Sequence, residues 1–361
     1  MIKNKQASRS NLIAIDIGSH SVKIAGGQRN GNKLKVSVLA KEQLPEGVFS
    51  GGRVQDPLAL KSVIQGMIKS NHIKIKDAVV TFESQDIIKR EMVVQKVDEN
   101  DQMELVTYEV SQYLPIDIDA YVLQFKVIDE VEENSGVKLK ILLGAMPKEI
   151  VKSLFDIIHE CGLNPLYMDM HSNSMEKFLE YDFDSISSNK TLAFVDFGHE
   201  IIDISIYEKG VFKFNRLLKM GAGEFDKVLV DNLKITKLEA ENRKKKTSVM
   251  GLKTASLKDD LDENDVKAIV INDTNHYIDE CVSEINKVFK YYTSRNVDNA
   301  IDKIYVHGGG AQFKDLAAFF TDKFEIATEI ISRFNAIEIA TKNPVEELPV
   351  FINAVGALIR N

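Results

Sequence analysis

The sequence predicts an α/β protein made of two similar domains, and two observations carry this prediction. Patterns typical of strands and of helices alternate along the 361 residues, as they do in α/β architectures. In addition, AIDIGSHSVKIA at Ala14–Ala25 has a partial echo in FVDFGHEIIDIS at Phe194–Ser205. Each copy reads as a strand, an Asp, a Gly two residues later, a polar turn and a second strand. The copies lie 180 residues apart, almost half the chain, so we expect a duplication that places two related hairpins on facing domains.

The first half begins with three strand-like segments between Asn11 and about Leu44. Asp56-Pro57 then opens a helix, because an acid at the N-cap followed by proline is a typical helix start. The strand DAVVTF follows. Residues 84–145 have a different rhythm, with a strand, a helix from about Asp101 to Tyr113, a break at LPID and two further strands. This rhythm predicts a compact inserted αβ module.

After the module, Pro147 starts a helix that ends at Gly162, and PLYMDM and HSNSMEKFLEY give a strand and a helix. The acidic, serine-rich DFDSISSNK indicates a linker. The second half repeats the plan with the strands TLAFVD, IIDISIY and VFKFNRLL and a helix from GAGEFD. A polar stretch then precedes a long amphipathic helix from about Asn275 to Ser294, the strand KIYVHGGG and a final helix near Val350–Ile359.

Composition and charge exclude several classes of protein. With 44% apolar and 28% charged residues the chain is an ordinary globular one, and no run approaches the roughly 18 apolar residues that cross a bilayer. The polar start MIKNKQASRS has no signal-peptide core, which favours a cytosolic location. With only Cys161 and Cys281, a disulfide framework or a cysteine-based metal site is excluded. A net charge of −8 gives no general reason to bind nucleic acid or anionic lipid.

The two hairpins contain the residue types of a phosphate clamp. A Gly at the turn lets the backbone approach a ligand closely, and successive amides in such a turn form a concave anion site. The Asp that ends the preceding strand can accept from the water around Mg²⁺, which bridges to phosphates. HGGG, at His307–Gly310, adds a glycine-rich loop between a strand and a helix. One hairpin alone is a common turn, but the symmetric pair predicts a site for a nucleoside triphosphate.

Other readings of the same motifs fail for lack of a second feature. HGGG also forms the oxyanion loop of lipase-like hydrolases, but the chain has no GxSxG nucleophile elbow. It has no GxxxxGK[ST] and no HExxH, which excludes a P-loop ATPase and a zincin. A sugar kinase needs a polar substrate pocket with a catalytic Asp in the inserted region, whereas this module is rich in apolar strands.

These motifs resemble those of the superfamily of actin, the sugar kinases and the 70-kDa heat-shock ATPases. DIGSHSVKI is similar to its phosphate-1 motif, DFGHEIID to phosphate-2 and HGGGAQF to the adenosine motif. Within it the chain most resembles the PilM group of type IV pilus assembly proteins, which is similar to the division protein FtsA. EVSQYLPIDIDAYVLQFKVID and LLGAMPKEIV resemble their 1C (SHS2) subdomain, GAGEFD their GGxxxD turn, and AENRK their AExxK motif. The resemblance runs from Asn11 to Arg360.

The resemblance implies an α/β, actin-like ATPase fold. Two duplicated ribonuclease-H-like domains would be joined by an inserted FtsA-like 1C subdomain and a smaller, helix-rich 2B subdomain. The implied layout is 1A at 1–83, inserted 1C at 84–146, 1A again at 147–189, 2A at 190–225, 2B at 226–274, 2A again at 275–335 and a return to 1A at 336–361.

Carried over position by position, the resemblance implies a site for ATP and Mg²⁺. Asp16 would hold a water molecule of Mg²⁺, and Asp203 would be a second neighbour of the ion. Glu241 and Lys244 would reach the ribose and the adenine, while the basic neighbours of Lys244, including Lys245, are explained as well by a solvated helix face. The residues implied to contact the nucleotide are Asp16, Gly18, Ser19, Ser21, Lys23, Asp196, Gly198, Gly221, Gly223, Glu241, Lys244, Gly308, Gly309 and Gly310.

The phosphate-2 motif departs from the family pattern. His199 and Glu200 follow Gly198, where a small residue is usual, and Ile202 replaces a hydroxyl. A carboxylate near a triphosphate is unfavourable unless it points away, and the lost hydroxyl removes a phosphate donor. We therefore expect ATP binding with at most a weak ATPase activity.

A residue that activates the attacking water is not evident from the sequence. Asp169, His171 and Asn173 lie where the family joins its two halves, and they are the candidates. Capping of the helix that starts there explains them equally well.

The resemblance implies a cytoplasmic scaffold of type IV pilus assembly. A groove between the first domain and the 1C module would hold a short cytosolic N-terminal peptide of an inner-membrane partner similar to PilN. This partner would recruit the chain to the inner face of the membrane without direct membrane insertion, and ATP would bias domain closure. A pilus assembly ATPase is a second candidate partner, and self-association is a further hypothesis.

Two alternatives stay open. The first is an FtsA-like division protein, although the chain stops at AVGALIRN and we expect no amphipathic membrane helix after it. The second is a small-molecule kinase of the same superfamily.

Overall fold

The computed structural model of the chain describes residues 11–30, 33–133, 136–183, 189–246, 263–297, 299–341 and 347–360. Parts of the predicted turn after the second strand, of the predicted linker and of the polar stretch before the long helix fall outside these ranges. Within them, no helix is both long enough and apolar enough to cross a membrane.

The first domain is built on a mixed six-stranded sheet with the order β10-β6-β1-β2-β3-β16. β1, β2 and β3 are antiparallel neighbours, and β6, β10 and β16 run parallel to the strands they pair with. β1 is buried from Leu12 to Ile17, which explains its nearly continuous apolar run. The strands are β1 (Asn11–Ile17), β2 (Ser21–Asn30), β3 (Lys33–Gln43), β6 (Asp77–Phe82), β10 (Asn164–Met170) and β16 (Ile337–Ile339).

Helices cover both faces of this sheet. α1 (Pro57–Ser70) and α3 (Lys148–Glu160) share one core with β1, β2 and β6. The predicted start of α1 is confirmed, because the Asp56 carboxylate accepts from the amides of Leu58 and Ala59. A short hairpin, β4 (Phe49–Ser50) and β5 (Arg53–Val54), lies between β3 and α1 in the chain.

The second domain repeats the strand order of the first, which confirms the predicted duplication. Its sheet has the order β13-β12-β11-β14-β15, and β3-β2-β1-β6-β10 is the matching part of the first sheet. The antiparallel and parallel neighbours also correspond. The strands are β11 (Thr191–Phe197), β12 (Ile202–Glu208), β13 (Val211–Leu218), β14 (Lys303–His307) and β15 (Thr328–Ile330).

The second domain has helices α6 (Ala222–Leu233), α7 (Lys237–Lys246), α8 (Glu263–Ser294) and α9 (Leu316–Phe324). The predicted start of the long helix near Asn275 is wrong, since α8 begins twelve residues earlier. The prediction followed the apolar stripe, whose first residue, Ile278, lies inside the helix. HGGG lies between a strand and a helix, as predicted, but the strand ends at His307 and the 3₁₀ turn η2 (Gly309–Gln312) precedes α9.

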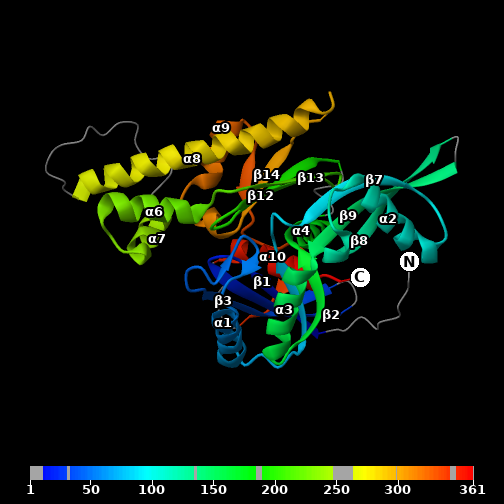
Figure 1. Ribbon diagram of the computed structural model, residues 1–361. Helices are drawn as coiled ribbons and strands as arrows, with labels where there is room; N and C mark the ends of the chain where they lie inside the picture. Colours follow the sequence, from blue (N-terminus) through cyan, green and yellow to red (C-terminus); the bar gives the residue numbers. More distant parts are fainter. Residues whose placement is uncertain are drawn as a thin grey trace.

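The inserted module is a three-stranded sheet with one helix. β7 (Ile88–Gln95), β8 (Tyr121–Glu133) and β9 (Gly136–Pro147) pair in the order β7-β9-β8. α2 (Glu99–Tyr113) packs Val106 and Val110 against them, in a core separate from those of the two domains. The module lies at the opposite end of the molecule from α6 and α7 (Figure 1).

Two helices lie between the two large sheets. α4 (His171–Asp182) and α10 (Ile352–Leu358) share one core with Ala14 of β1 and Phe194 of β11. α10 follows a 3₁₀ turn, η3 (Leu348–Phe351), so the predicted final helix is present with a later start. In the chain, α4 follows β10 and precedes the second domain, and α10 returns the chain to the first domain (Figure 1).

Candidate functional site

The turns of the two related hairpins have the same hydrogen bonding. The amide of Gly18 donates to the carbonyl of Ser21 at 3.2 Å, and the amide of Gly198 donates to that of Ile201 at 3.0 Å. Strand register pairs Asp16 with Lys23 in the first hairpin and Asp196 with Asp203 in the second. The repeat therefore places an acid, Asp203, where its counterpart has a lysine.

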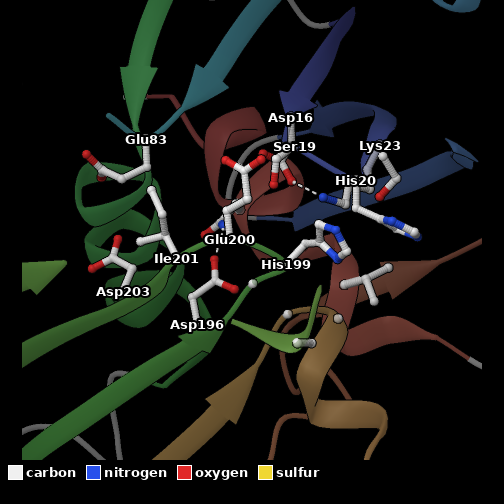
Figure 2. Close-up of a pocket in the computed structure, with 18 of the residues that line it drawn as sticks. Asp16, Ser19, His20, Lys23, Glu83, Asp196, His199, Glu200, Ile201 and Asp203 are labelled. Atoms are coloured by element: carbon white, nitrogen blue, oxygen red, sulfur yellow. Dashed lines mark hydrogen bonds and ion pairs between the residues drawn. The ribbon is translucent and has the colours of Figure 1, made fainter. Parts of the chain in front are cut away.

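The two hairpins and the HGGG loop line one cleft between the domains (Figure 2). In the figure, Asp16, Ser19 and Lys23 lie on the first-domain side and Asp196 and Asp203 on the second-domain side. The sequence-predicted residues that the structure brings together here are Asp16, Gly18, Ser19, Ser21, Lys23, Asp196, Gly198, Asp203, Glu241, Gly308 and Gly309.

Four predicted residues are placed differently. Gly221 and Gly223 line an adjoining cavity together with His199. Gly310 is not among the lining residues and packs closely against Phe197, since a Cβ there would lie 2.5 Å from Cγ of that ring. The side chain of Lys244 is outside what the structure describes. Its neighbour Lys245 lines the cleft and forms an ion pair with Glu241 at 3.0 Å.

Asp16 is held by two cationic groups at the end of β1. It is 2% exposed, with Lys23 Nζ at 3.3 Å from Oδ2 and His171 Nε2 at 3.0 Å from Oδ1. Burial alone would raise the pKa of Asp16, but Lys23 and His171 outweigh it and the pKa is lowered. Asp16 is therefore a buried anion at neutral pH.

Of the three candidates at the start of α4, only His171 reaches the cleft. Its Nδ1 lies 3.8 Å from Asp196 Oδ2, so the ring stands between the strand-end acids of both domains. Burial lowers the pKa of His171, yet the hydrogen bond and charge of Asp16 dominate and raise it to about 9. Asp169 instead accepts from Asn173 at 2.6 Å and pairs with Lys177 at 2.5 Å.

Asp196 is fixed by residues of the C-terminal helix and the HGGG loop. Asn353 of α10 donates to Oδ2 at 2.7 Å, and His307 Nδ1 lies 3.9 Å from Oδ1. Gly308 has φ +82°, and a Cβ there would overlap Asp196 Oδ1. The first glycine of HGGG is thus required for both its backbone conformation and the close approach to Asp196.

Asp203 belongs to a buried group of charges at the inner end of the cleft. Asn215 of β13 donates to its carboxylate and accepts from Lys89 at 3.0 Å, and Lys89 also binds Glu83 at 2.6 Å. Burial raises the pKa of Asp203 to about 7; the ammonium of Lys89 opposes the rise and the carboxylate of Glu83 adds to it. Glu83, His171 and Asp203 offer ligand atoms that lie within 4.8 Å of one another.

The structure explains the unusual residues of the second hairpin. The His199 ring packs on Gly223, where a Cβ would overlap it, and stands against His20 with ring centroids 4.7 Å apart. Glu200 Oε2 accepts from Ser50 Oγ at 3.0 Å and from the Gly51 amide at 3.3 Å. Glu200 therefore crosses the cleft to bind the β4–β5 turn of the first domain.

Several lining residues have no local sequence signal. Lys41, Glu83 and Asn353 lie far apart in the chain and only the fold brings them to the cleft, whereas Gln312 belongs to the HGGGAQF motif. His20 has a partial signal, since it follows Ser19 in the first hairpin, where its ring lies 3.8 Å from Glu241.

The paired sheets, the shared hairpin geometry and the cleft between them define a protein with the actin-like ATPase fold. The structure of a "PilM-PilN type IV pilus biogenesis complex" matches with a TM-score of 0.80 at 19% identity, covering 97% of this chain and 98% of that one. The ethanolamine utilization protein EutJ of Carboxydothermus hydrogenoformans matches with a TM-score of 0.56 at 14% identity, covering 96% and 89%. MreB 5 of Spiroplasma citri bound to AMPPNP has a TM-score of 0.50 at 13% identity, covering 96% and 95%.

The family follows from the sequence itself. The model of the family described as type IV pilus assembly protein PilM matches residues 14–360. The chain belongs to this family of actin-like pilus assembly proteins, as the motifs indicated.

Proposed function

We propose that the chain binds ATP with Mg²⁺ between its two hairpins. The observation that carries this proposal is the pair of equivalent Gly turns, Gly18 and Gly198, facing each other across one cleft with an Asp behind each. Backbone amides and Lys23 supply donors for phosphate oxygens. The nucleoside would bind in the part of the cleft that is lined by Gly308, Gly309, Glu241 and Lys245. The solved MreB 5, which shares the fold, is bound to AMPPNP.

The donor set of the cleft fits Mg²⁺. This ion takes oxygen ligands and keeps several waters, so it needs one or two carboxylates beside the phosphates. Asp16, Asp196 and Asp203 present such oxygens from both domains. When bound, the ion would neutralise phosphate charge, with Asp16 and Asp203 as its protein neighbours.

The same geometry favours binding over rapid hydrolysis. A general base must accept a proton, but a pKa of about 9 keeps His171 protonated at neutral pH, where it donates to Asp16. Ile202 is fully buried and provides no hydroxyl, and Glu200 adds a negative charge beside the phosphates. We infer a nucleotide-dependent binding protein with at most weak ATPase activity.

The partner we propose is a short cytosolic N-terminal peptide of an inner-membrane protein similar to PilN. The solved relative is a PilM-PilN complex. The module joins the first domain directly through β9 and α3, and Lys126 of β8 binds the largely buried Glu176 of α4 at 3.0 Å. A peptide bound between the module and the first domain would recruit the chain to the membrane and link the partner to the pilus motor.

Calorimetric titration tests the nucleotide assignment. Asp16→Ala removes a buried carboxylate that we propose as a neighbour of the bound Mg²⁺, so we expect ATP–Mg²⁺ affinity to fall about tenfold or more. Asp156→Ala, an exposed acid on α3, is the control and should bind as the wild type does. Equal heats for the wild type and Asp16→Ala would refute the site.

Fluorescence anisotropy with a labelled peptide tests the partner. The probe is the cytosolic N-terminal segment of the PilN-like protein from the same organism. Saturable binding to the full chain, competed by unlabelled peptide, is expected. Binding no tighter than that of a scrambled peptide would rule the partner out.

A further inference from the structure

The first strand of the inserted module sends one charged side chain back toward the cleft. Lys89 of β7 is almost buried, and its ammonium contacts Glu83 Oε2 at 2.6 Å, with both side chains under 10% exposed. The same ammonium donates to Asn215 Oδ1 at 3.0 Å. A single residue of the module therefore contacts the end of β6 in the first domain and β13 in the second.

Asn215 continues this contact to the cleft. Its amide donates to the Asp203 carboxylate, to the Ile204 carbonyl at 3.2 Å and to Ser205 Oγ at 3.0 Å. Glu83 and Asp203 both line the cleft, and Figure 2 shows them together at one end of it, away from Lys23. The contacts thus lead from the module through Lys89, Asn215 and Asp203 to the cleft.

The charges make Lys89 necessary to this arrangement. Two carboxylates, Glu83 and Asp203, have oxygens within 4.8 Å of the same His171 ring, which is itself bonded to Asp16. Burying such acids is unfavourable without a partner that supplies both charge and hydrogen bonds. Lys89 gives this support directly to Glu83 and through Asn215 to Asp203.

We propose that Lys89 is a positioning residue that the inserted module contributes to the nucleotide site. It orients Asp203, through Asn215, toward the cation of a bound nucleotide. The proposal rests on the proposed binding of ATP and Mg²⁺ and adds the residue that joins this site to the module. Since Lys89 is part of β7, a cation that draws Asp203 into the cleft also pulls on the module, and coupling of this kind acts in both directions.

Hydrogen–deuterium exchange of the full chain, with and without ATP and Mg²⁺, tests this link. In the wild type, nucleotide should slow exchange in both hairpins and also in β7. In Lys89→Met the hairpins should still be protected, while β7 should lose its nucleotide-dependent protection and ATP affinity should fall about tenfold in Mg²⁺ but little in EDTA. Lys89→Arg, which keeps charge and donors, should restore both readouts.

The control is Lys140→Met, which removes the Lys140–Glu91 pair inside the module and leaves Lys89 in place. It should behave as the wild type does. If Lys89→Met is poorly folded because Glu83 is left unpaired, the double variant Glu83→Gln/Lys89→Met removes both charges, and β7 should again show no response to nucleotide.

The outcomes separate the two proposals. Unprotected hairpins in the wild type would mean that nucleotide does not bind and that the proposed function is wrong. Protected hairpins with an unresponsive wild-type β7, or a β7 that responds equally in Lys89→Met, would overturn the role of Lys89 alone.

Discussion

His199 and Gly223 form a matched pair at the edge of the cleft. The imidazole fills the space in which a side chain at Gly223 would lie, and the Gly223 amide donates to the His199 carbonyl at 2.9 Å. The sequence resemblance led us to expect a small residue after the phosphate-2 Gly. Here the bulky residue is on the hairpin, and the turn that faces it has the small one.

Gly223→Ala should therefore destabilise the protein by about 1–3 kcal/mol, the usual cost of overpacking. The double variant His199→Ala/Gly223→Ala should recover most of this loss, as measured by chemical denaturation. Gly309→Ala has no atom within 4 Å of the new methyl group and should leave stability nearly unchanged. No recovery in the double variant would show that a contact other than the His199 ring makes Gly223 necessary.

His171 gives the nucleotide-free protein a specific pH dependence. Asp16, Asp196 and Glu83 face its ring and raise its pKa from 6.5 to about 9, against the effect of burial. The stabilisation is complete below the unfolded pKa of 6.5 and is lost as pH rises through about 9. Between pH 7 and 9.5 the wild-type melting temperature should fall by several degrees more than that of His171→Gln. Parallel curves would contradict the raised pKa.

Site residues differ in how far sequence can identify them. Asp16 and Asp196 are found because strand, Asp and Gly are contiguous, so local spacing determines their geometry. Asp169 and His171 could not be told apart, since they lie two residues apart where a strand becomes a helix and only the packing decides which side chain faces the cleft. Asn353 has no motif, because its role comes from the packing of α10 beneath Asp196.

At the scale of elements, α4 and α10 cross so closely that only glycine fits between them. A Cβ at Gly356 would overlap the Ser174 carbonyl oxygen and lie 3.3 Å from Phe178 Cβ. Asn353, which holds Asp196, is one turn away on the same helix. The position of α10 therefore determines the position of an acid in the other domain.

Gly356→Ala should lower the free energy of unfolding by about 3 kcal/mol and weaken ATP binding as Asn353 shifts. The matched control is Gly66→Ala on the exposed side of α1, where a Cβ meets nothing within 4 Å; it should stabilise the protein by about 0.5–1 kcal/mol. Denaturant titration and calorimetry measure both effects. An unchanged Gly356→Ala protein would show that the helices separate at little cost.

The predictability of the elements follows the same division between local and distant causes. The start of α1 was predicted because the N-cap and Pro57 are local signals, and the module was predicted from its change of rhythm. The start of α8 was missed because the apolar stripe used for the prediction begins at Ile278, well inside the helix. The subdomain boundaries drawn from the sequence stay a prediction.

At the scale of the whole molecule, Glu200 joins the domains across the cleft through the Ser50–Gly51 turn. Because its carboxylate also lines the cleft, it would repel the phosphates of the proposed nucleotide. Glu200→Gln should raise ATP affinity about fivefold, by removing one negative charge and loosening this contact. Calorimetry with Glu338→Gln, a charge change on the outer strand β16, provides the comparison. Weaker binding would mean that Glu200 contacts the bound cation.

The strand register of the two hairpins has a consequence for direction. Two identical halves would present either two lysines or two acids opposite the strand-end aspartates, and such a cleft would accept an elongated ligand equally well from either end. With Lys23 in one half and Asp203 in the other, a single register position makes the halves unequal. The cleft thereby has a polarity, so the proposed nucleotide would bind in one preferred orientation.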